Sequence, residues 1–318
     1  MPRGAGKPTA RRWVPDFAGN LVRGLGTQQS NDDKERTPLD AIIGVRELSS
    51  RISWGAALTE FNFTFLLMFF HVSIVRACTD PGVFSSPVLA IAVAKGVVIL
   101  LCTYAGAASG AHMNPNVTLA TLLIGFTTIC RFVMYTAAQL LGAILGIAAA
   151  RCAHGWDVAA SPSELGACGI GEIPQGGALV ASATFFHFIL SIIGGVAFDE
   201  RQGAIFGPIL GPVAISAAVG VSIFASARTA MMINWAECVA IGIVGGDFDG
   251  NEWISFVGPL IASVVHAVLF LGVPPSQANG HFTPPLLRNL REASLQPQEG
   301  SVEPAAGEPA RKVKPNFT

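Results

Sequence analysis

Charged side chains are scarce in this chain of 318 residues. They make up 13% of the sequence, whereas hydrophobic residues make up 51%. A soluble globular protein usually carries charge on about a quarter of its residues. The scarcity of charge therefore argues against an ordinary soluble domain and predicts that most of the chain lies in an apolar environment.

Recognisable motifs of enzymes and metal sites are also missing. The sequence contains no P-loop, no glycine-rich dinucleotide motif after an expected strand and no nucleophile motif. Four histidines are scattered without the spacing of metal ligands, so we expect ordinary membrane or loop histidines. They are His71, His112, His187 and His266. We expect no enzyme chemistry, no metal and no cofactor.

Long apolar blocks are what the chain has instead. Crossing a bilayer as a helix takes ~20 mostly apolar residues. Six blocks reach that length, near 52–75, 87–107, 127–150, 178–198, 203–224 and 253–273. Two shorter apolar segments, about 114–124 and 234–244, indicate re-entrant or interfacial pieces. The sequence therefore predicts an all-α membrane protein with six transmembrane helices plus two re-entrant half-helices.

Basic residues gather near the two ends of the chain. Nine of the twenty Lys and Arg lie in residues 1–51 and five more follow residue 285. The loops after the third block and before the sixth are acidic. Because positive charge collects on the cytosolic side, both termini are expected in the cytosol. Their composition predicts disordered tails at 1–51 and 274–318 around a membrane core at 52–273.

The six cysteines contain no CxxC pair, which argues against a metal or redox motif. Cys152 and Cys168 share one loop on the side away from the cytosol, which makes them candidates for a disulfide. The alternative, that the cysteines are free thiols, is the one we favour.

The membrane core consists of two similar halves, 52–151 and 178–273. Each half has two spans, a short half-helix that opens with Asn114 or Asn234, and a third span. Three spans per half is an odd number, so the halves cross the membrane with opposite topology. Inverted repeats are typical of channels and transporters, whose sites lie at the repeat interface near the midplane.

Small residues are placed for close packing in the third span. Gly142 and Gly146 lie four residues apart, which puts both on one face of a helix. This spacing favours a close contact with a neighbouring span; the alternative is the general glycine richness of membrane helices.

The first half-helix begins in "HMNPNVTLA", residues 112–120. Asn is a good helix N-cap and Pro is favoured at the first helical position, so Asn114 and Pro115 start a helix. The free N–H groups and the helix dipole place about half an elementary positive charge at that end. Two such ends facing each other form a positive focus that disfavours cations and protons while neutral solutes pass.

These motifs resemble the aquaporin and glycerol-facilitator family, the major intrinsic proteins. The similarity is specific in "TEFNFTFLLMFF" (59–70), "SGAHMNPNVTLA" (109–120), "RFVMYTAAQLLGAILG" (131–146) and "WISFVGPLIA" (253–262). It covers about 52–273 and excludes the tails. The resemblance implies a passive channel for water or small neutral solutes such as glycerol. It also implies a homotetramer in the lipid bilayer, with one pore per subunit and no role for nucleic acid.

The resemblance also implies roles for individual residues. Asn114 and Asn234 would be the two pore asparagines. Glu60 matches the buried acid that braces the re-entrant loop backbone, a role that accounts for a costly acid inside the membrane. The corresponding acid of the second half is missing, because Ser182 stands in that region.

Both pore motifs depart from the family's Asn-Pro-Ala. The first reads Asn114-Pro115-Asn116, and the second reads Asn234-Trp235-Ala236. Trp235 either fills space between helices or towards lipid, or plugs the pore.

The outer constriction departs further. Three positions after the second Asn, where the family usually has Arg, stands Glu237. The span-2 position that usually supplies an aromatic aligns with Lys95, about eight residues or roughly 12 Å into its span. A charge at that depth is costly unless it is paired or faces water. We infer an ion pair of Lys95 with Glu237. The alternative is that Lys95 snorkels to the headgroups and Glu237 faces water.

Spacing before Asn234 assigns the remaining constriction positions to Ser222 and Met231. Arg228 lies close by, either replacing the missing Arg or serving as a solvated charge in the vestibule.

Two functions therefore stay open. One is a passive channel for water or small neutral solutes, which the intact first half favours. The other is a poorly conducting protein of the same fold with a structural or regulatory role in an intracellular membrane, which the altered second motif favours. The swapped filter charge also allows an ion channel. The sequence ranks neither water above glycerol nor plasma membrane above intracellular membrane.

Overall fold

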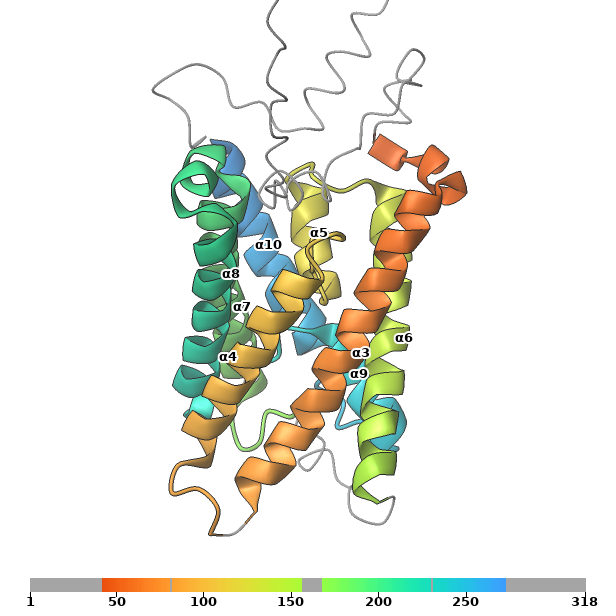
Figure 1. Ribbon diagram of the computed structural model, residues 1–318. Helices are drawn as coiled ribbons and strands as arrows, with labels where there is room; N and C mark the ends of the chain where they lie inside the picture. Colours follow the sequence, from red (N-terminus) through yellow and green to blue (C-terminus); the bar gives the residue numbers. More distant parts are fainter. Residues whose placement is uncertain (1–41, 81, 156–167, 230, 273–318) are drawn as a thin grey trace, which may run out of the picture.

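The computed structural model describes residues 42–80, 82–155, 168–229 and 231–272. The described residues form a bundle of helices joined by loops, which confirms the all-α prediction (Figure 1). Most of the two expected tails, residues 1–41 and 273–318, lies outside the described part of the chain.

Within the described residues, six helices are long and apolar enough to cross a membrane. They are α3 (Arg51–Thr79), α4 (Pro87–Ala105), α6 (Ile129–His154), α7 (Gln175–Ile193, continued by the π-helix η4, Gly194–Phe198), α8 (Glu200–Ala225, followed by the 3-10 turn η5, Ser226–Arg228) and α10 (Ile254–Gly272). Two shorter helices, α5 (Pro115–Leu123) and α9 (Trp235–Gly245), correspond to the expected half-helices.

The N-terminal tail expected over 1–51 ends earlier than the sequence predicts. Val45–Ser49 form a 3-10 helix, η2, just before α3. The carboxylate of Glu47 accepts hydrogen bonds from Arg131 Nε at 2.7 Å and from Thr128 Oγ1 at 3.1 Å. These bonds attach η2 to the first turn of α6, a contact that the polar composition of the segment does not reveal.

The two halves of the chain repeat one packing scheme. α3 packs along α6 in the first half, and α7 packs along α10 in the second. Each half-helix lies against the third span of the other half, α5 on α10 and α9 on α6. α3 begins and α10 ends at the same end of the bundle (Figure 1). This exchange of half-helices brings the starts of α5 and α9 together inside the bundle.

The contact between α3 and α6 depends on two glycines. A side chain on Gly142 or Gly146 would collide with the backbone carbonyl of Phe61 or Phe65. The small-residue spacing in the sequence therefore marks a real close approach of two helices.

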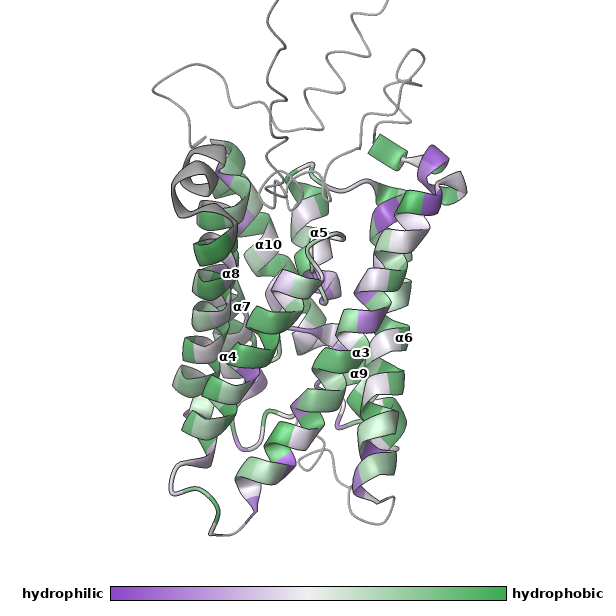
Figure 2. Cartoon of the chain, viewed as in Figure 1, coloured by the Kyte–Doolittle hydropathy of each residue, from purple (hydrophilic) through white to green (hydrophobic). Residues whose placement is uncertain are grey.

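Hydrophobic residues cover the outer faces of the spans. Figure 2 shows them along α4, α8 and α10, and large apolar side chains such as Val93, Val97 and Leu101 are exposed. In water such a surface would be costly, but in lipid it is expected. The polar residues that matter for function lie inside the bundle.

Replacing Gly146 with Ala should destabilise the fold, because the added methyl group meets the α3 backbone. Forcing extra atoms into a packed contact typically costs about 1–3 kcal/mol. Thermal unfolding of the purified protein measures the loss. Gly55→Ala on α3, where a methyl group meets open space, is the matched control and should hold or raise the melting temperature. Equal shifts for both variants would contradict the close contact.

Candidate functional site

The start of α5 is built as the sequence predicts. Asn114 has an extended backbone, and its Oδ1 accepts a hydrogen bond from the N–H of Asn116 at 2.8 Å. Pro115 occupies the first helical position, where no N–H is needed. The half-helix therefore begins with a capped end that points into the interior.

The loop before α5 is held by the buried carboxylate of Glu60. It accepts hydrogen bonds from the backbone N–H of His112 at 3.0 Å and of Met113 at 2.7 Å. Gln139 Nε2 donates to it at 2.8 Å. Met113 and Ala111 have positive φ values of 48° and 50°, a strained conformation for residues other than glycine. The backbone bonds stabilise this conformation, which is the bracing contact implied by the family resemblance.

The two half-helices are tied to each other through their asparagines. Asn114 Nδ2 donates to the carbonyl of Ile233 at 3.0 Å, and Asn234 Nδ2 lies 3.5 Å from the carbonyl of Met113. Each asparagine thus reaches the residue that precedes the other. Both asparagines line the internal cavity, at the point where the two helix ends meet.

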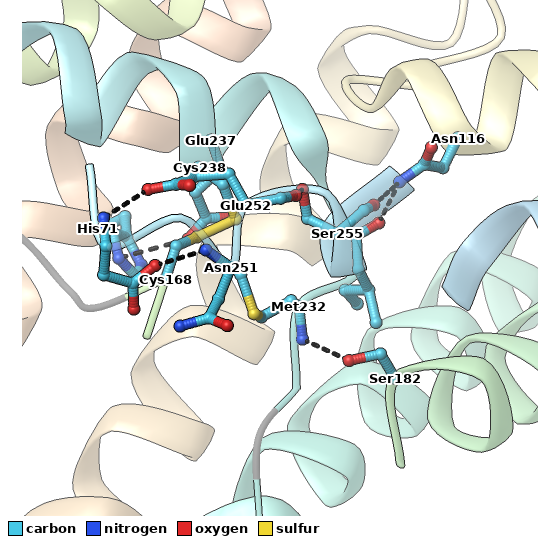
Figure 3. The surroundings of a disulfide bond; sticks show 12 residues. His71, Asn116, Cys168, Ser182, Met232, Glu237, Cys238, Asn251, Glu252 and Ser255 are labelled. Atoms are coloured by element: carbon cyan, nitrogen blue, oxygen red, sulfur yellow. Dashed lines mark hydrogen bonds and ion pairs between the residues drawn. A yellow bond between two sulfur atoms is a disulfide. The ribbon is translucent and has the colours of Figure 1, made fainter. Parts of the chain in front are cut away.

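The second half-helix begins differently from the first. Asn234 makes no side-chain cap on α9, and its buried Oδ1 has no hydrogen-bond partner. The unusual Asn116 of the first motif is fully buried and donates from Nδ2 to the carbonyls of Ile233 at 2.8 Å and Ser255 at 2.9 Å (Figure 3). The extra amide therefore joins the first half-helix to the second loop and to α10.

Ser182 occupies the place of the missing second acid. Its Oγ accepts a hydrogen bond from the backbone N–H of Met232 at 3.0 Å (Figure 3). The hydroxyl of Ser182, on α7, accepts one hydrogen bond from the second loop, whereas Glu60 accepts two from the backbone of the first loop. The second loop consequently has the weaker hydrogen-bonded brace.

A disulfide joins Cys168 to Cys238, with Cα atoms 5.2 Å apart (Figure 3). The suggested pairing of Cys168 with Cys152 is therefore wrong. The alternative of free thiols is wrong for Cys168 and Cys238 but correct for the other four cysteines. Cys152 is an exposed free thiol at the end of α6. The partners are 70 residues apart, and only the fold brings the loop over the first turn of α9. The bond attaches the loop to α9 at Cys238, the residue that follows Glu237.

A cavity of about 480 Å³ runs between the helices. It extends from Val75 and Val88, near the α3–α4 connection, to Ala197 and Phe198 of η4. Asn114 and Asn234 are among the residues that line it. Its wall near η4 is apolar, whereas the part beside α9 carries charge. The cavity is therefore lined by residues of both halves of the chain, with its charged groups beside α9.

Lys95 and Glu237 meet in the charged part of the cavity beside α9. Lys95 Nζ lies 3.5 Å from Glu237 Oε1, and each side chain is largely buried. This is the ion pair inferred from the sequence, and snorkelling of Lys95 is not observed. His71 of α3 also reaches Glu237, with Nε2 3.3 Å from the same Oε1 (Figure 3). The sequence does not single out His71, because its only local signal is a histidine within an apolar span.

Of the other residues expected at the constriction, some line the cavity and others do not. Met231 lines the cavity. Ser222 is buried, donates to the carbonyl of Ala218 within α8 and does not line the cavity; Val219 and Ile223 form that wall. Arg228 is exposed in η5.

Trp235 and Ala236 follow Asn234 on α9, and neither lines the cavity. Ala236 is fully buried, and Trp235 is half-buried. The tryptophan therefore does not fill the passage.

Comparisons with known proteins agree with this architecture. The family model described as "Major intrinsic protein" matches residues 47–270. The chain is 33% identical over 235 residues to Aquaporin-2 of Bos taurus, covering 73% of this chain and 84% of that protein. It is 31% identical over 265 residues to the lens fiber major intrinsic protein of Gallus gallus, covering 82% and 97%.

Among solved structures, the chain is similar to the X-ray structure of the aquaglyceroporin from Plasmodium falciparum. The TM-score is 0.58 at 21% sequence identity, covering 69% of this chain and 96% of that chain. At this identity the likeness concerns the fold.

Removing the disulfide between Cys168 and Cys238 should destabilise the fold around α9. Disulfides typically stabilise a fold by about 2–4 kcal/mol, so replacing both Cys168 and Cys238 with Ser should lower the melting temperature. Cys152→Ser is the matched control and should leave it unchanged. A thiol reductant should lower the melting temperature of the wild type but not that of the double variant. An equal effect of reductant on both proteins would contradict the assigned pairing.

Proposed function

The chain belongs to the major intrinsic protein family, and from that premise we propose that the cavity between its half-helices is the conducting pore. The protein is a passive channel for water or small solutes and not an enzyme. The observation that carries the proposal is the meeting of two helix N-termini in the cavity, joined through Asn114 and Asn234.

Proton exclusion follows from the charges at this meeting point. Each half-helix directs its positive end at the middle of the passage, which opposes a cation or a proton there. Asn114 uses its amide to contact the opposite loop while lining the cavity. A water molecule passing between the two ends exchanges hydrogen bonds with the asparagines and is oriented by both dipoles.

Selectivity is assigned to the constriction beside α9. Lys95 supplies from α4 the positive charge that the family usually places on the second half-helix. Glu237 holds this lysine against the wall. Met231 completes the site, and we replace Ser222 in this role with Val219 and Ile223, the residues through which α8 lines the cavity. The site offers donors and acceptors to a neutral solute without a net charge from the Lys–Glu pair.

The poorly conducting alternative is less well supported by the contacts. It rests on the altered motif residues, yet Asn116 and Trp235 lie off the cavity wall. Asn116 bonds two carbonyls inside the protein. These substitutions alter the packing around the half-helices, and their side chains do not obstruct the cavity between them.

Assembly and topology belong to the same proposal. We propose a homotetramer whose subunits each have a channel domain at 52–273. The even number of spans fits the placement of both termini in the cytosol. The homotetramer also suits the apolar faces that a single chain exposes, such as Val93, Val97 and Leu101 on α4. Lipid and neighbouring subunits would share those faces.

Stopped-flow light scattering on proteoliposomes tests the proposed function. Under an osmotic gradient, vesicles that contain the protein should shrink faster than empty vesicles, because the pore adds a water path. A glycerol gradient in the same assay ranks the two solutes. No acceleration for either solute, with the folded oligomer verified, would refute the conducting pore and favour the structural role.

Lys95→Met should make the pore leak cations. The change leaves Glu237 as an uncompensated acid in the constriction, and a unit charge a few Å away is worth several kcal/mol in a partly buried setting. We expect K⁺ flux to rise about tenfold or more, since ~1.4 kcal/mol is a factor of ten. A K⁺ gradient across proteoliposomes measures it. Lys95→Arg keeps the charge and should stay tight; leakage in both variants would count against a charge effect.

A further inference from the structure

His71 is a third ionisable group in the constriction, and the proposed function does not use it. It lies on α3, its side chain is 4% exposed, and it lines the cavity. Its Nε2 lies 3.3 Å from Glu237 Oε1. A buried histidine that lines the cavity beside a carboxylate can change the charge that a passing solute or ion meets.

His71 and Lys95 approach the same carboxylate oxygen. Their nitrogens lie 3.3 and 3.5 Å from Glu237 Oε1. The three residues come from α3, α4 and α9, so the arrangement exists only in the folded bundle. One acid is therefore shared between a permanent cation and a group whose charge depends on pH.

The ionisable groups on the elements around His71 have other contacts. On α6, Arg151 donates to the carbonyl of Val244, and His154 Nε2 lies 3.0 Å from Ser73 Oγ. In the loop before α5, His112 Nδ1 lies 3.1 Å from Thr118 Oγ1. Arg76 lies farther along α3 itself, in its last turn. Within the described part of the chain, the carboxylate of Glu237 lies 3.3 Å from His71, and Lys95 shares that carboxylate.

We propose that His71 is a specificity-determining residue, a proton-dependent second cation that adds positive charge to the constriction when the solution is acidic. Histidine is the side chain that ordinarily changes charge between about pH 5 and 8, whereas Lys and Glu remain ionised over that range. The inference rests on the proposed function, because it requires solutes to cross this constriction.

The proposal can be written as a balance of charge. In the wild type, Lys95 and Glu237 sum to zero, and protonation of His71 makes the site positive. In Lys95→Met the site is negative with His71 neutral, and protonation returns it to zero. In this variant, a protonated His71 therefore neutralises Glu237 in place of Lys95. Without both residues, no cation balances Glu237, and only a proton on Glu237 itself could remove the negative charge.

The Lys95→Met background makes this charge measurable as K⁺ flux. Proteoliposomes with a K⁺ gradient are compared at pH 8 and pH 5. K95M should leak at pH 8 and about tenfold less at pH 5, because two opposite charges a few Å apart are worth several kcal/mol. H71Q/K95M should leak more than K95M at pH 5, because no cation remains beside Glu237. Water flux measured on the same vesicles reports whether each variant forms a pore.

Matched variants separate His71 from other groups. H187Q/K95M changes a histidine of α7 that does not line the cavity, and it should keep the pH dependence of K95M. E237Q/K95M removes the acid and should leak at neither pH. H71F/K95M keeps a ring without a titrating proton, and it replaces H71Q/K95M if that variant does not fold.

The outcomes distinguish the inference from the function on which it rests. Equal pH dependence in K95M and H71Q/K95M overturns the role of His71 while water flux leaves the channel standing. The absence of a K⁺ leak from K95M at pH 8, in vesicles that pass water, overturns it as well. A wild type that passes neither water nor glycerol overturns the proposed function and the inference together.

Discussion

Irregular backbone can exist at membrane depth only if its polar groups find partners within the protein. The two loops that lead into α5 and α9 are such backbone, and the pore depends on how they are held. Glu60 satisfies two N–H groups of the first loop and stabilises its left-handed residues. Without that carboxylate, two N–H groups of the loop would lose their hydrogen-bond partner, and the conformation that directs the start of α5 into the cavity would lose its support.

The second loop meets the same requirement with different chemistry. One hydroxyl, from Ser182, takes the place of a carboxylate. The side chain of Asn116 reaches across from the other half, and the disulfide of Cys238 fixes the first turn of α9. Ser182 and Asn116, which depart from the family pattern, are therefore related in space to the disulfide, because all three contacts hold the second loop or its half-helix. The inverted repeat keeps its geometry while the two halves use unlike contacts.

How much the sequence reveals depends on the range of the interaction. Span lengths and the capped start of α5 follow from local composition, and the pairing of Lys95 with Glu237 follows from the cost of a buried charge. The disulfide partner of Cys168 and the position of His71 depend on segments that only the fold brings together. Ser222 was placed by counting back from Asn234, but rotation about α8 decides which residues face the cavity, and Val219 and Ile223 do.

The bond between Cys168 and Cys238 also sets an order of assembly. Disulfides form in oxidising compartments and not in the cytosol. Cys168 lies in the loop that the proposed topology carries across the membrane, and Cys238 lies on a half-helix that enters from the same side. Both spans that flank the loop and the second half-helix must therefore be inserted before the sulfurs can meet. The disulfide beside Glu237 therefore forms only after the second half-helix has entered the membrane from the side away from the cytosol.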